Sequence, residues 1–393
     1  MWGSLAILLF LLGLLLQQEA LFALAAFLLM MSPLAWLWNR LALGGLQYRR
    51  TFADTHVFAG ETASFDVELE NDKWLPLPWV RVDDRFPESM PPVERPLAAS
   101  SSPGISFLVH VASLGSSERV RWTYQLTCPQ RGFYFFGPAR LRTGDIFGLF
   151  RQDIRLEHSD RLVVYPQVRP LPALGLPDKN PFGDQTVQSF LFEDPLRAVG
   201  ARDYHPDDPL KRVHWKATAR QQRMQVRVYE RTRSRQVVVF LNVSTFAKHW
   251  HGVDPDLLEK VIRVAASLAF HAYSQAQPTG LIANGSLPRS DQPIRVLPGR
   301  APGQMRRLLE ALAAVTSFPT SSLADLLELE SPRLPWGATL VVVTAVVDDR
   351  LLATLDTLHR AGRPVVLVSL DKAFQDPGTD YGPLIYHLDK RVV

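Results

Sequence analysis

The sequence predicts a multidomain protein with three parts: an N-terminal hairpin of two transmembrane helices, an all-β sandwich of immunoglobulin-like size, and an α/β domain with a doubly wound, mostly parallel sheet. Three observations predict this organisation. Residues 1–38 contain one charged side chain, Glu19. From Tyr48 to Pro166, apolar and polar residues alternate with a period of two. Beyond Gln236, short apolar runs alternate with segments whose apolar residues recur at helical spacing.

The membrane prediction is based on two apolar runs, Leu5–Leu16 and Ala20–Trp38, which the polar residues 17–19 separate. A helix crosses a bilayer with about 20 apolar residues, and about 17 is the lower limit. The second run is therefore long enough, and the first is long enough if it begins at Met1. We expect residues 1–40 to form a membrane hairpin of two helices.

The positive-inside rule predicts that the soluble domains face the cytoplasm, at the inner membrane, because arginines follow the second run: Arg40, Arg49 and Arg50. Two alternatives are a cleaved signal peptide with its site at residues 23–25 and a single long, tilted span. A signal peptide normally has a basic segment before its apolar run, and this sequence has none.

The sandwich prediction covers residues 48–166. Ser64–Glu70 alternates as a half-buried strand does, and four further segments have the same pattern: Trp79–Asp83, Ile105–Val111, Val120–Leu126 and Arg161–Tyr165. The sole cysteine, Cys128, excludes an intramolecular disulfide and fits a reducing compartment. We expect it to pack as a small apolar residue.

An extended, semi-rigid connector is predicted over residues 167–185, because five prolines lie within the 16 residues 166–181. The last part, residues 186–393, contains three apolar runs that predict strands buried on both faces: 236–241, 339–344 and 364–370. Ligands of such sheets bind beyond the carboxyl ends of the strands. The segments 242–246 and 344–349 are therefore the places to look for a site.

Charge is concentrated in one segment. Residues 196–235 contain eleven basic and four acidic side chains, a net charge of +7, whereas the whole chain carries +4. Such a segment is typical of a surface that binds phosphate, nucleic acid or anionic lipid. A solvated face with internal ion pairs explains the same composition, and we do not expect nucleic acid as a partner of a membrane-tethered protein.

Several motifs resemble the bacterial domain-of-unknown-function family fifty-eight. In the sandwich they are Arg131–Tyr134 with Gly137-Pro138, Asp145–Phe150 and Val164–Pro166. The block Arg202–Asp208, followed by Arg212–Lys216 and Ala219-Arg220, resembles the defining block of that family. One departure is Asp207, where the family usually has glycine.

The resemblance implies an α/β domain like that of von Willebrand factor A, and a protein often encoded beside MoxR-type AAA+ ATPases. It also marks residues that bind a partner or stabilise the fold: Arg202, Tyr204, Asp208, Arg212, His214, Trp215, Lys216, Ala219 and Arg220. We expect Trp215 and Arg220 to be core or interdomain anchors, because an aromatic ring and a guanidinium can pack together.

A von Willebrand A domain holds Mg²⁺ with Asp-x-Ser-x-Ser after its first strand and with a later Thr and Asp. The corresponding positions here have lost two carboxylates and one hydroxyl, and they read Asn242, Ser244, Phe246, Thr344 and Ala345. Since Mg²⁺ prefers carboxylate oxygens, we expect a degenerate site without metal. Asp348 and Asp349 could compensate only from another position on the loop.

No phosphate-binding loop, dinucleotide fingerprint or nucleophile elbow occurs in the sequence. We therefore expect no catalytic residue and no cofactor, and a scaffold or adaptor rather than an enzyme. It would dock protein partners in the assembly or maturation of other proteins, and the resemblance implies that one partner is a MoxR-type AAA+ ATPase. Two alternatives are a metal-dependent hydrolase that uses Asp203, Asp207, Asp208 and His214, and binding of anionic lipid or nucleic acid by residues 196–235.

Overall fold

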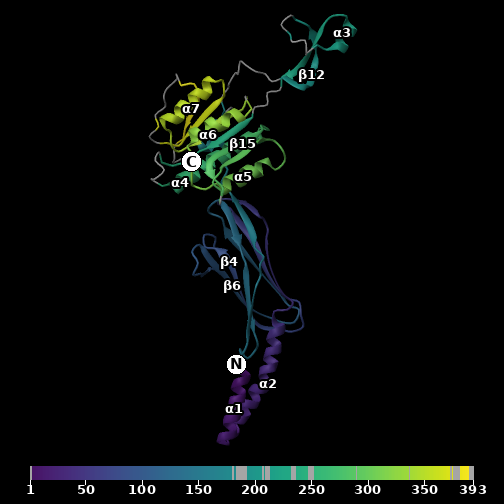
Figure 1. Cartoon of the computed structure of the whole chain (residues 1–393), viewed down its shortest axis with the longest axis vertical. Coiled ribbons are helices and arrows are strands. Elements are labelled where there is room, and N and C mark those ends of the chain that lie inside the picture. Colours follow the sequence, from purple (N-terminus) through teal and green to yellow (C-terminus); the bar gives the residue numbers. More distant parts are fainter. Residues whose placement is uncertain are drawn as a thin grey trace. The chain divides into compact units, whose positions relative to one another are not determined.

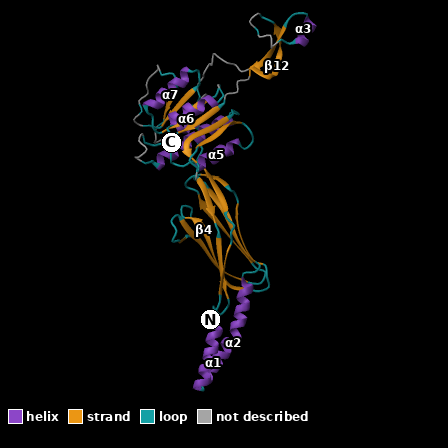
Figure 2. Ribbon diagram, in the orientation of Figure 1, coloured by secondary structure: helices purple, strands orange, loops and turns teal. Residues whose placement is uncertain are grey.

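The computed structural model describes residues 2–178, 181–182, 193–205, 208, 213–231, 236–246, 252–288, 290–335, 337–371, 374 and 381–388. The chain divides into two compact units, Met1–Gln167 and Val168–Val393. The first contains two helices and a β-rich domain, and the second contains a mixed sheet with helices and a separate two-stranded sheet (Figures 1 and 2).

The first unit begins with two helices that pack against each other, α1 (Trp2–Leu16) and α2 (Glu19–Ala42). The rings of Phe10 and Phe22 meet edge to face, 5.5 Å apart. With 24 residues, α2 is long and apolar enough to cross a membrane. With 15 residues, α1 is about 22 Å long, less than the roughly 30 Å of a bilayer core. Of the two predicted spans, α2 alone reaches the required length within the described residues.

The end of α2 is fixed to the β-rich domain. The chain passes from Ala42 to the first strand within three residues, and the Lys73 ammonium donates hydrogen bonds to the carbonyls of Ala42 and Gly44, the latter at 2.8 Å. A cation at a helix C-terminus also interacts favourably with the helix dipole. Ala42 is buried in an apolar cluster with Leu77 and Leu141.

The β-rich domain consists of short strands, as the period-two pattern predicts, and they form three sheets. The first sheet has the strand order β1 (Leu46–Phe52), β3 (Thr62–Asn71) and β7 (Arg119–Thr127). The second has the order β10 (Arg151–Arg155), β9 (Ala139–Gly144), β4 (Leu77–Pro87), β6 (Ile105–Leu114) and β5 (Ala98–Ala99). The third has the order β2 (His56–Phe58), β11 (Asp160–Tyr165) and β8 (Gly132–Phe136), and in it the pair β2 and β11 is parallel. In β3 every second residue is buried, which matches the predicted half-buried strand.

Cys128 lies in the core of this domain beside Phe65, Phe86 and Phe136. Burial raises the pKa of its thiol to about 11, so the thiolate is not formed near neutral pH. Cys128 is therefore the packed apolar residue that we expected.

The second unit contains a six-stranded mixed sheet. Its order is β16 (Pro293–Gly299), β15 (Thr279–Ser286), β14 (Val237–Leu241), β17 (Thr339–Thr344), β18 (Val365–Ser369) and β19 (Leu384–His387). All neighbours are parallel except β15 and β16. The three predicted buried strands are β14, β17 and β18, and the edge strand β19 was not predicted.

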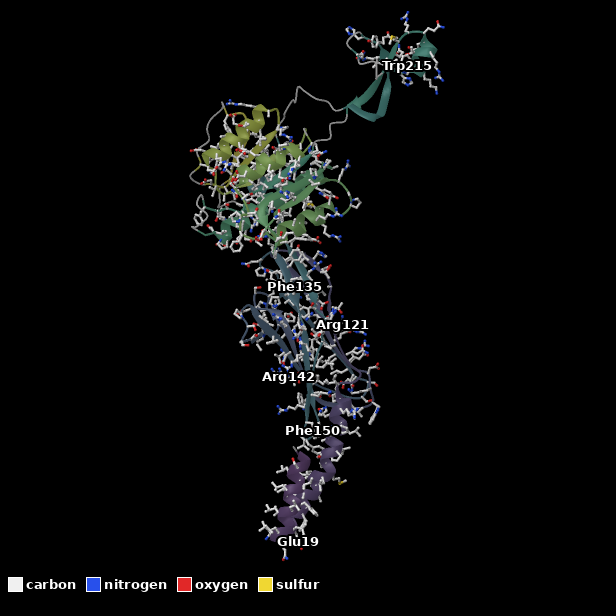
Figure 3. All side chains as sticks on the ribbon, in the orientation of Figure 1. Glu19, Arg121, Phe135, Arg142, Phe150 and Trp215 are labelled. Atoms are coloured by element: carbon white, nitrogen blue, oxygen red, sulfur yellow. The ribbon has the colours of Figure 1, made fainter. Side chains whose placement is uncertain are left out.

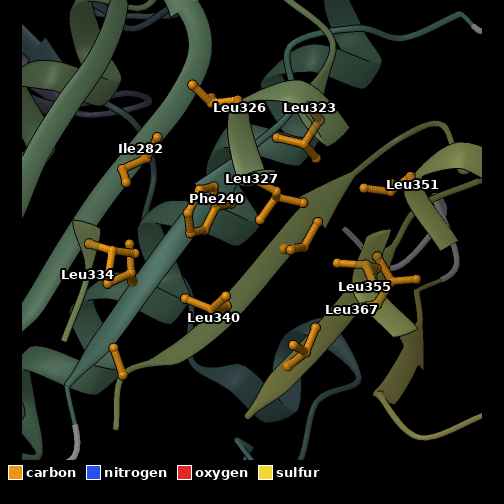
Figure 4. Close-up of a cluster of buried hydrophobic side chains, with 14 residues drawn as sticks. Phe240, Ile282, Leu323, Leu326, Leu327, Leu334, Leu340, Leu351, Leu355 and Leu367 are labelled. Carbon is orange, nitrogen blue, oxygen red and sulfur yellow. The ribbon is translucent and has the colours of Figure 1, made fainter. Parts of the chain in front are cut away.

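Helices cover both faces of this sheet. They are α4 (Pro255–Ser274), α5 (Gln304–Ala314), α6 (Leu323–Glu330), the 3-10 turn η4 (Ser331–Arg333) and α7 (Asp349–Arg360). Phe240, Leu327 and Leu355 belong to the core that α6 and α7 share with the sheet (Figure 4). The opposite face packs against α4, where apolar residues at helical spacing are buried.

Two segments differ from expectation. The predicted connector contains a 3-10 turn, η1 (Leu171–Leu174), which contacts α4 and is not extended. Its leucines are buried, and this apolar packing outweighs the tendency of proline-rich sequence to remain extended. The basic segment contains a two-stranded sheet, β12 (Glu193–Asp203) and β13 (Gln225–Arg231), with α3 (Trp215–Gln221) between the strands.

Candidate functional site

A cavity of about 540 Å³ opens at the carboxyl ends of β14 and β17. After β14 the chain forms β15 and β16 on one side of it and then returns to form β17 on the other side. The strand order therefore reverses at this point. The cavity is lined by Asn242, Ser244, Phe246, Phe318, Pro319, Thr320, Ser321, Ser322, Leu323, Ala324, Val346, Asp348 and Leu351. It includes residues of both predicted segments, 242–246 and 344–349.

A network of buried side-chain amides forms the floor of this site. Asn242 donates from Nδ2 to Thr344 Oγ1 at 2.9 Å, and its Oδ1 accepts from Asn284 Nδ2 at 2.9 Å and from the Ser244 amide at 3.1 Å. Asn284 in turn accepts from the Val243 amide at 2.8 Å. The network cross-links the ends of three neighbouring strands, because Asn284 belongs to β15.

The donor set does not fit the Mg²⁺ ion that the family resemblance implies. The Asn242 side-chain oxygen already accepts two hydrogen bonds, Phe246 offers an apolar ring, and Ala345 offers a buried methyl group. Hard divalent cations require several oxygen ligands, usually carboxylates. Within the part of the chain that the structure describes, no three His, Cys, Asp or Glu side chains are placed to hold a metal.

Asp348 lies at the cavity but is used by the fold. Its Oδ1 accepts from the Leu351 amide at 2.7 Å and so caps the first turn of α7. Ser322 caps α6 in the same way, accepting from the Asp325 amide at 3.1 Å. Asp349 is exposed in the first turn of α7. The structure therefore gives Asp348 a helix-capping role.

The rim of the cavity is aromatic. The side chains of Phe246 and Phe318 are 40% and 75% exposed, respectively. Exposed aromatic rings around a polar floor are typical of a binding surface, since rings supply much of the energy of protein interfaces.

Sequence reasoning missed Asn284 and Phe318. A signal existed for Asn284: it follows the apolar run Leu281–Ala283, and a polar residue in a buried strand needs hydrogen-bond partners. No sequence pattern pointed to Phe318, because it lies between α5 and α6, outside any periodic helix or strand segment.

The segment that resembles the family block forms its own hydrogen-bonded unit. Arg202 donates to both oxygens of Asp208, at 2.7 and 2.5 Å, and the Asp208 carboxylate also accepts from the His205 amide at 2.9 Å. The Arg202 guanidinium and the His205 amide lower the pKa of Asp208 to about 2. The Tyr204 amide donates to the Met224 carbonyl at 2.9 Å, which connects the two strands.

The predicted hydrolase group is divided among such contacts. Gln225 donates to Asp203, Arg202 binds Asp208, and His214 Nδ1 accepts from the Ala217 amide at 3.2 Å, which caps α3. Asp207 lies outside the described residues, as does Arg212 of the family block. The described members of the group thus stabilise the hairpin of β12 and β13.

The outer face of α3 differs from expectation. Trp215 is 68% exposed (Figure 3), and Lys216, Ala219 and Arg220 are exposed beside it. Of the two predicted roles, core anchor and interdomain anchor, the core role was wrong for Trp215, because the short helix α3 buries none of its residues; the interdomain role stays a prediction. Lys216 and Arg220 are four residues apart and therefore share one face.

Comparison with known proteins supports the family resemblance. The family described as "Protein of unknown function DUF58" matches residues 200–373, which include the end of β12, all of β13 and the residues that line the cavity. Residues 200–373 of this chain are thus similar to the DUF58 family. The uncharacterized protein YeaD of Bacillus subtilis (strain 168) is 25% identical to this chain over 244 residues, which are 62% of this chain and 57% of YeaD. The chain thus covers less than two thirds of that relative.

Solved structures resemble about a third of this chain. A CARDB domain from Pyrococcus furiosus is 15% identical, covering 30% of this chain and 93% of that domain, with a TM-score of 0.20. A cohesin module from Clostridium perfringens is 14% identical, covering 30% and 97%, with a TM-score of 0.21. The sporulation control protein Spo0M of Bacillus subtilis is 11% identical, covering 33% and 52%, with a TM-score of 0.20. Likenesses of this extent carry no functional argument.

Proposed function

We propose that this protein is a membrane-anchored adaptor that docks a partner protein at the cavity of its mixed sheet. The observation that carries the proposal is the combination of a satisfied floor and an exposed aromatic rim. The amides of Asn242 and Asn284 are engaged with each other and with the backbone, whereas Phe246 and Phe318 are exposed. Such a site offers contact area rather than a nucleophile or an acid–base pair.

Anchoring by α2 is the membrane part of the proposal, with α1 as the shorter arm of a two-span hairpin. The cytoplasmic orientation is supported by Arg40 and the exposed Arg49. Arg50 gives less support than its place in the sequence suggests, because it is buried in ion pairs with Asp84 and Asp160.

The proposed partner is a MoxR-type AAA+ ATPase, a class that the family resemblance implies. It would supply the nucleotide chemistry for which this sequence has no motif, and the mixed-sheet domain would correspond to a von Willebrand A-like docking module. The substrate of the pair would be another protein in assembly or maturation.

Crosslinked pull-down from membranes, with and without ATP, tests this function. We compare the wild type with Phe246→Ser/Phe318→Ser and with a matched control, Leu287→Ser/Leu297→Ser, which changes two exposed leucines of the same unit. Wild type and control are expected to recover an AAA+ ATPase, and the phenylalanine variant is expected to lose it. Recovery of no AAA+ ATPase under either nucleotide condition would overturn the proposal.

Binding of an anionic surface is a second candidate function. Lys216, Arg220 and Arg223 are exposed on or directly after α3 and form no ion pair within the described residues. Binding to anionic vesicles or to nucleic acid would then weaken steeply with salt, with a smaller slope in Lys216→Gln/Arg220→Gln. A response that is flat with salt would eliminate this function.

A further inference from the structure

The loop that joins β9 to β10, residues 145–150, is the sandwich motif that the adaptor function leaves unexplained. Ile146 and Phe147 are 60% and 49% exposed, which is unusual for two consecutive large apolar residues. At the tip of a β-hairpin in water, two such side chains expose apolar surface without contributing to the core.

This loop lies at the end of the sandwich from which α2 leaves. Strand pairings place it there: Leu46, the first residue of β1, pairs with Asn71, and Leu77, the first residue of β4, pairs with Leu114. Val80, near the start of β4, pairs with Thr143 next to the loop. β9 and β10 also contact α2 directly. Figure 3 shows Phe150 at the end of the helix pair opposite Glu19.

Asp145 satisfies the backbone of the loop from within. Its carboxylate accepts from the amides of Phe147, Leu149 and Phe150, at 2.7, 3.3 and 2.6 Å, and its carbonyl accepts from the Gly148 amide at 3.3 Å. Asp145 itself is buried. Because these amides are already bonded, the loop can enter a lipid surface without leaving N–H groups unsatisfied.

The surroundings of the loop suit the interfacial zone of a bilayer. Trp74 is 76% exposed and follows Lys73, which holds the end of α2. Exposed Arg40 and Arg151 lie at the end of α2 and directly after the loop, respectively. Tryptophan and arginine are enriched at this depth, where rings reach the headgroup level and cations meet anionic lipids.

We propose that residues 145–150 form a second membrane contact, a preorganised loop that inserts Ile146 and Phe147 into the lipid interface beside α2. The occupant is the bilayer and not a protein, because the strands on either side of the loop, β9 and β10, contact the apolar helix α2. The inference rests on the membrane anchoring proposed above, and it adds a contact between the sandwich and the lipid.

Depth-dependent quenching tests the loop in the full-length protein. An environment-sensitive probe is attached to Ile146→Cys or Phe147→Cys, and the protein is reconstituted into vesicles of phosphatidylcholine and phosphatidylglycerol with quencher-labelled lipid. The native Cys128 is buried and does not compete for the label. Ser101→Cys is the matched control, because it is exposed between β5 and β6 at the opposite end of the sandwich. Leu29→Cys reports on α2.

We expect probes at 146 and 147 to be quenched at least about twofold more than the probe at 101, with emission shifted to the blue. If the probe in α2 is quenched and the loop probes behave like position 101, the loop inference is overturned while anchoring stands. If the loop probes are quenched and the α2 probe is not, the loop contacts lipid but anchoring by α2 fails, and the inference of a second contact beside α2 fails with it. If neither is quenched, both fail; a loop that docks a protein would give no quenching at 146 or 147 in vesicles without other proteins.

Discussion

Arg50 and Asp84 form an ion pair inside the sandwich, with Nη1 and Oδ2 2.5 Å apart and side chains that are 2% and 0% exposed. Arg50 also donates to Asp160 and to the Phe136 carbonyl, both at 2.7 Å, and Tyr48 donates to Asp84 at 2.5 Å. A buried charge costs several kcal/mol unless it is paired and hydrogen-bonded. Arg50 has three partners, whereas Asp84 accepts both of its hydrogen bonds at Oδ2 and its buried Oδ1 has none.

Arg50→Met is expected to destabilise the sandwich by about 3–5 kcal/mol, because it leaves the Asp84 carboxylate buried without its cation. The midpoint of denaturant unfolding measures this loss. Arg119→Met is the control, since Arg119 forms an exposed pair with Glu70 at 2.6 Å and should leave the midpoint nearly unchanged. Equal midpoints for the two variants would contradict the structural role of Arg50.

His110 is expected to make the stability of the sandwich depend on pH. Burial lowers its pKa to about 4, and its Nε2 lies 2.8 Å from the Tyr124 hydroxyl. The unfolded chain binds a proton near pH 6.5 and the folded chain does not, so the stabilisation is complete above pH 6.5 and is lost as pH falls toward 4. The free energy of unfolding should drop by about 3 kcal/mol over this range.

The measurement is denaturant unfolding at several pH values between 4 and 7. His110→Gln is expected to flatten the dependence, whereas His387→Gln, which changes an exposed histidine of the other unit, should preserve it. A wild-type midpoint that is constant over this interval would refute the assigned pKa.

Asp208 is expected to titrate near pH 2 in the folded protein, because Arg202 and the His205 amide stabilise its carboxylate. The hairpin of β12 and β13 is therefore stabilised by this carboxylate above the ordinary Asp pKa, and it loses this stabilisation as the pH falls toward 2. Side-chain carboxyl NMR of the full chain gives the midpoint. Arg202→Gln should return it toward the ordinary value, and a wild-type midpoint that already lies there would show that the ion pair does not form.

Divalent cations are expected to leave the wild type unaffected, so that EDTA does not change its thermal midpoint. Asn242→Asp alone should destabilise the domain by about 1–3 kcal/mol, because the hydrogen bond to Thr344 is lost and a charge is buried. The triple variant Asn242→Asp/Phe246→Ser/Ala345→Asp restores oxygen ligands and should gain a midpoint that rises with Mg²⁺. A fall in the wild-type midpoint on adding EDTA would mean that the donor set binds metal after all.

Periodic elements were predictable, and contacts between distant residues were not. The alternation at Ser64–Glu70 and the apolar run at 236–241 are local signals, and the structure places β3 and β14 on them. The amide network could not be derived, because Asn242 and Asn284 are 42 positions apart and meet only when β14 and β15 pair. Trp215 misled because large aromatic residues are usually buried, whereas a seven-residue helix has too little inner surface to cover one.

The hydrogen bonds from Lys73 to the end of α2 have a thermodynamic consequence. A domain on a flexible tether explores a large volume, and it loses that freedom when it captures its target. Here only three residues join helix and strand, and the Lys73 ammonium bonds to the carbonyls of Ala42 and Gly44 at the helix end, which restricts rotation of the β-rich domain about that end. If α2 anchors the protein as proposed, the entropic cost of orienting this domain relative to the membrane is met during folding.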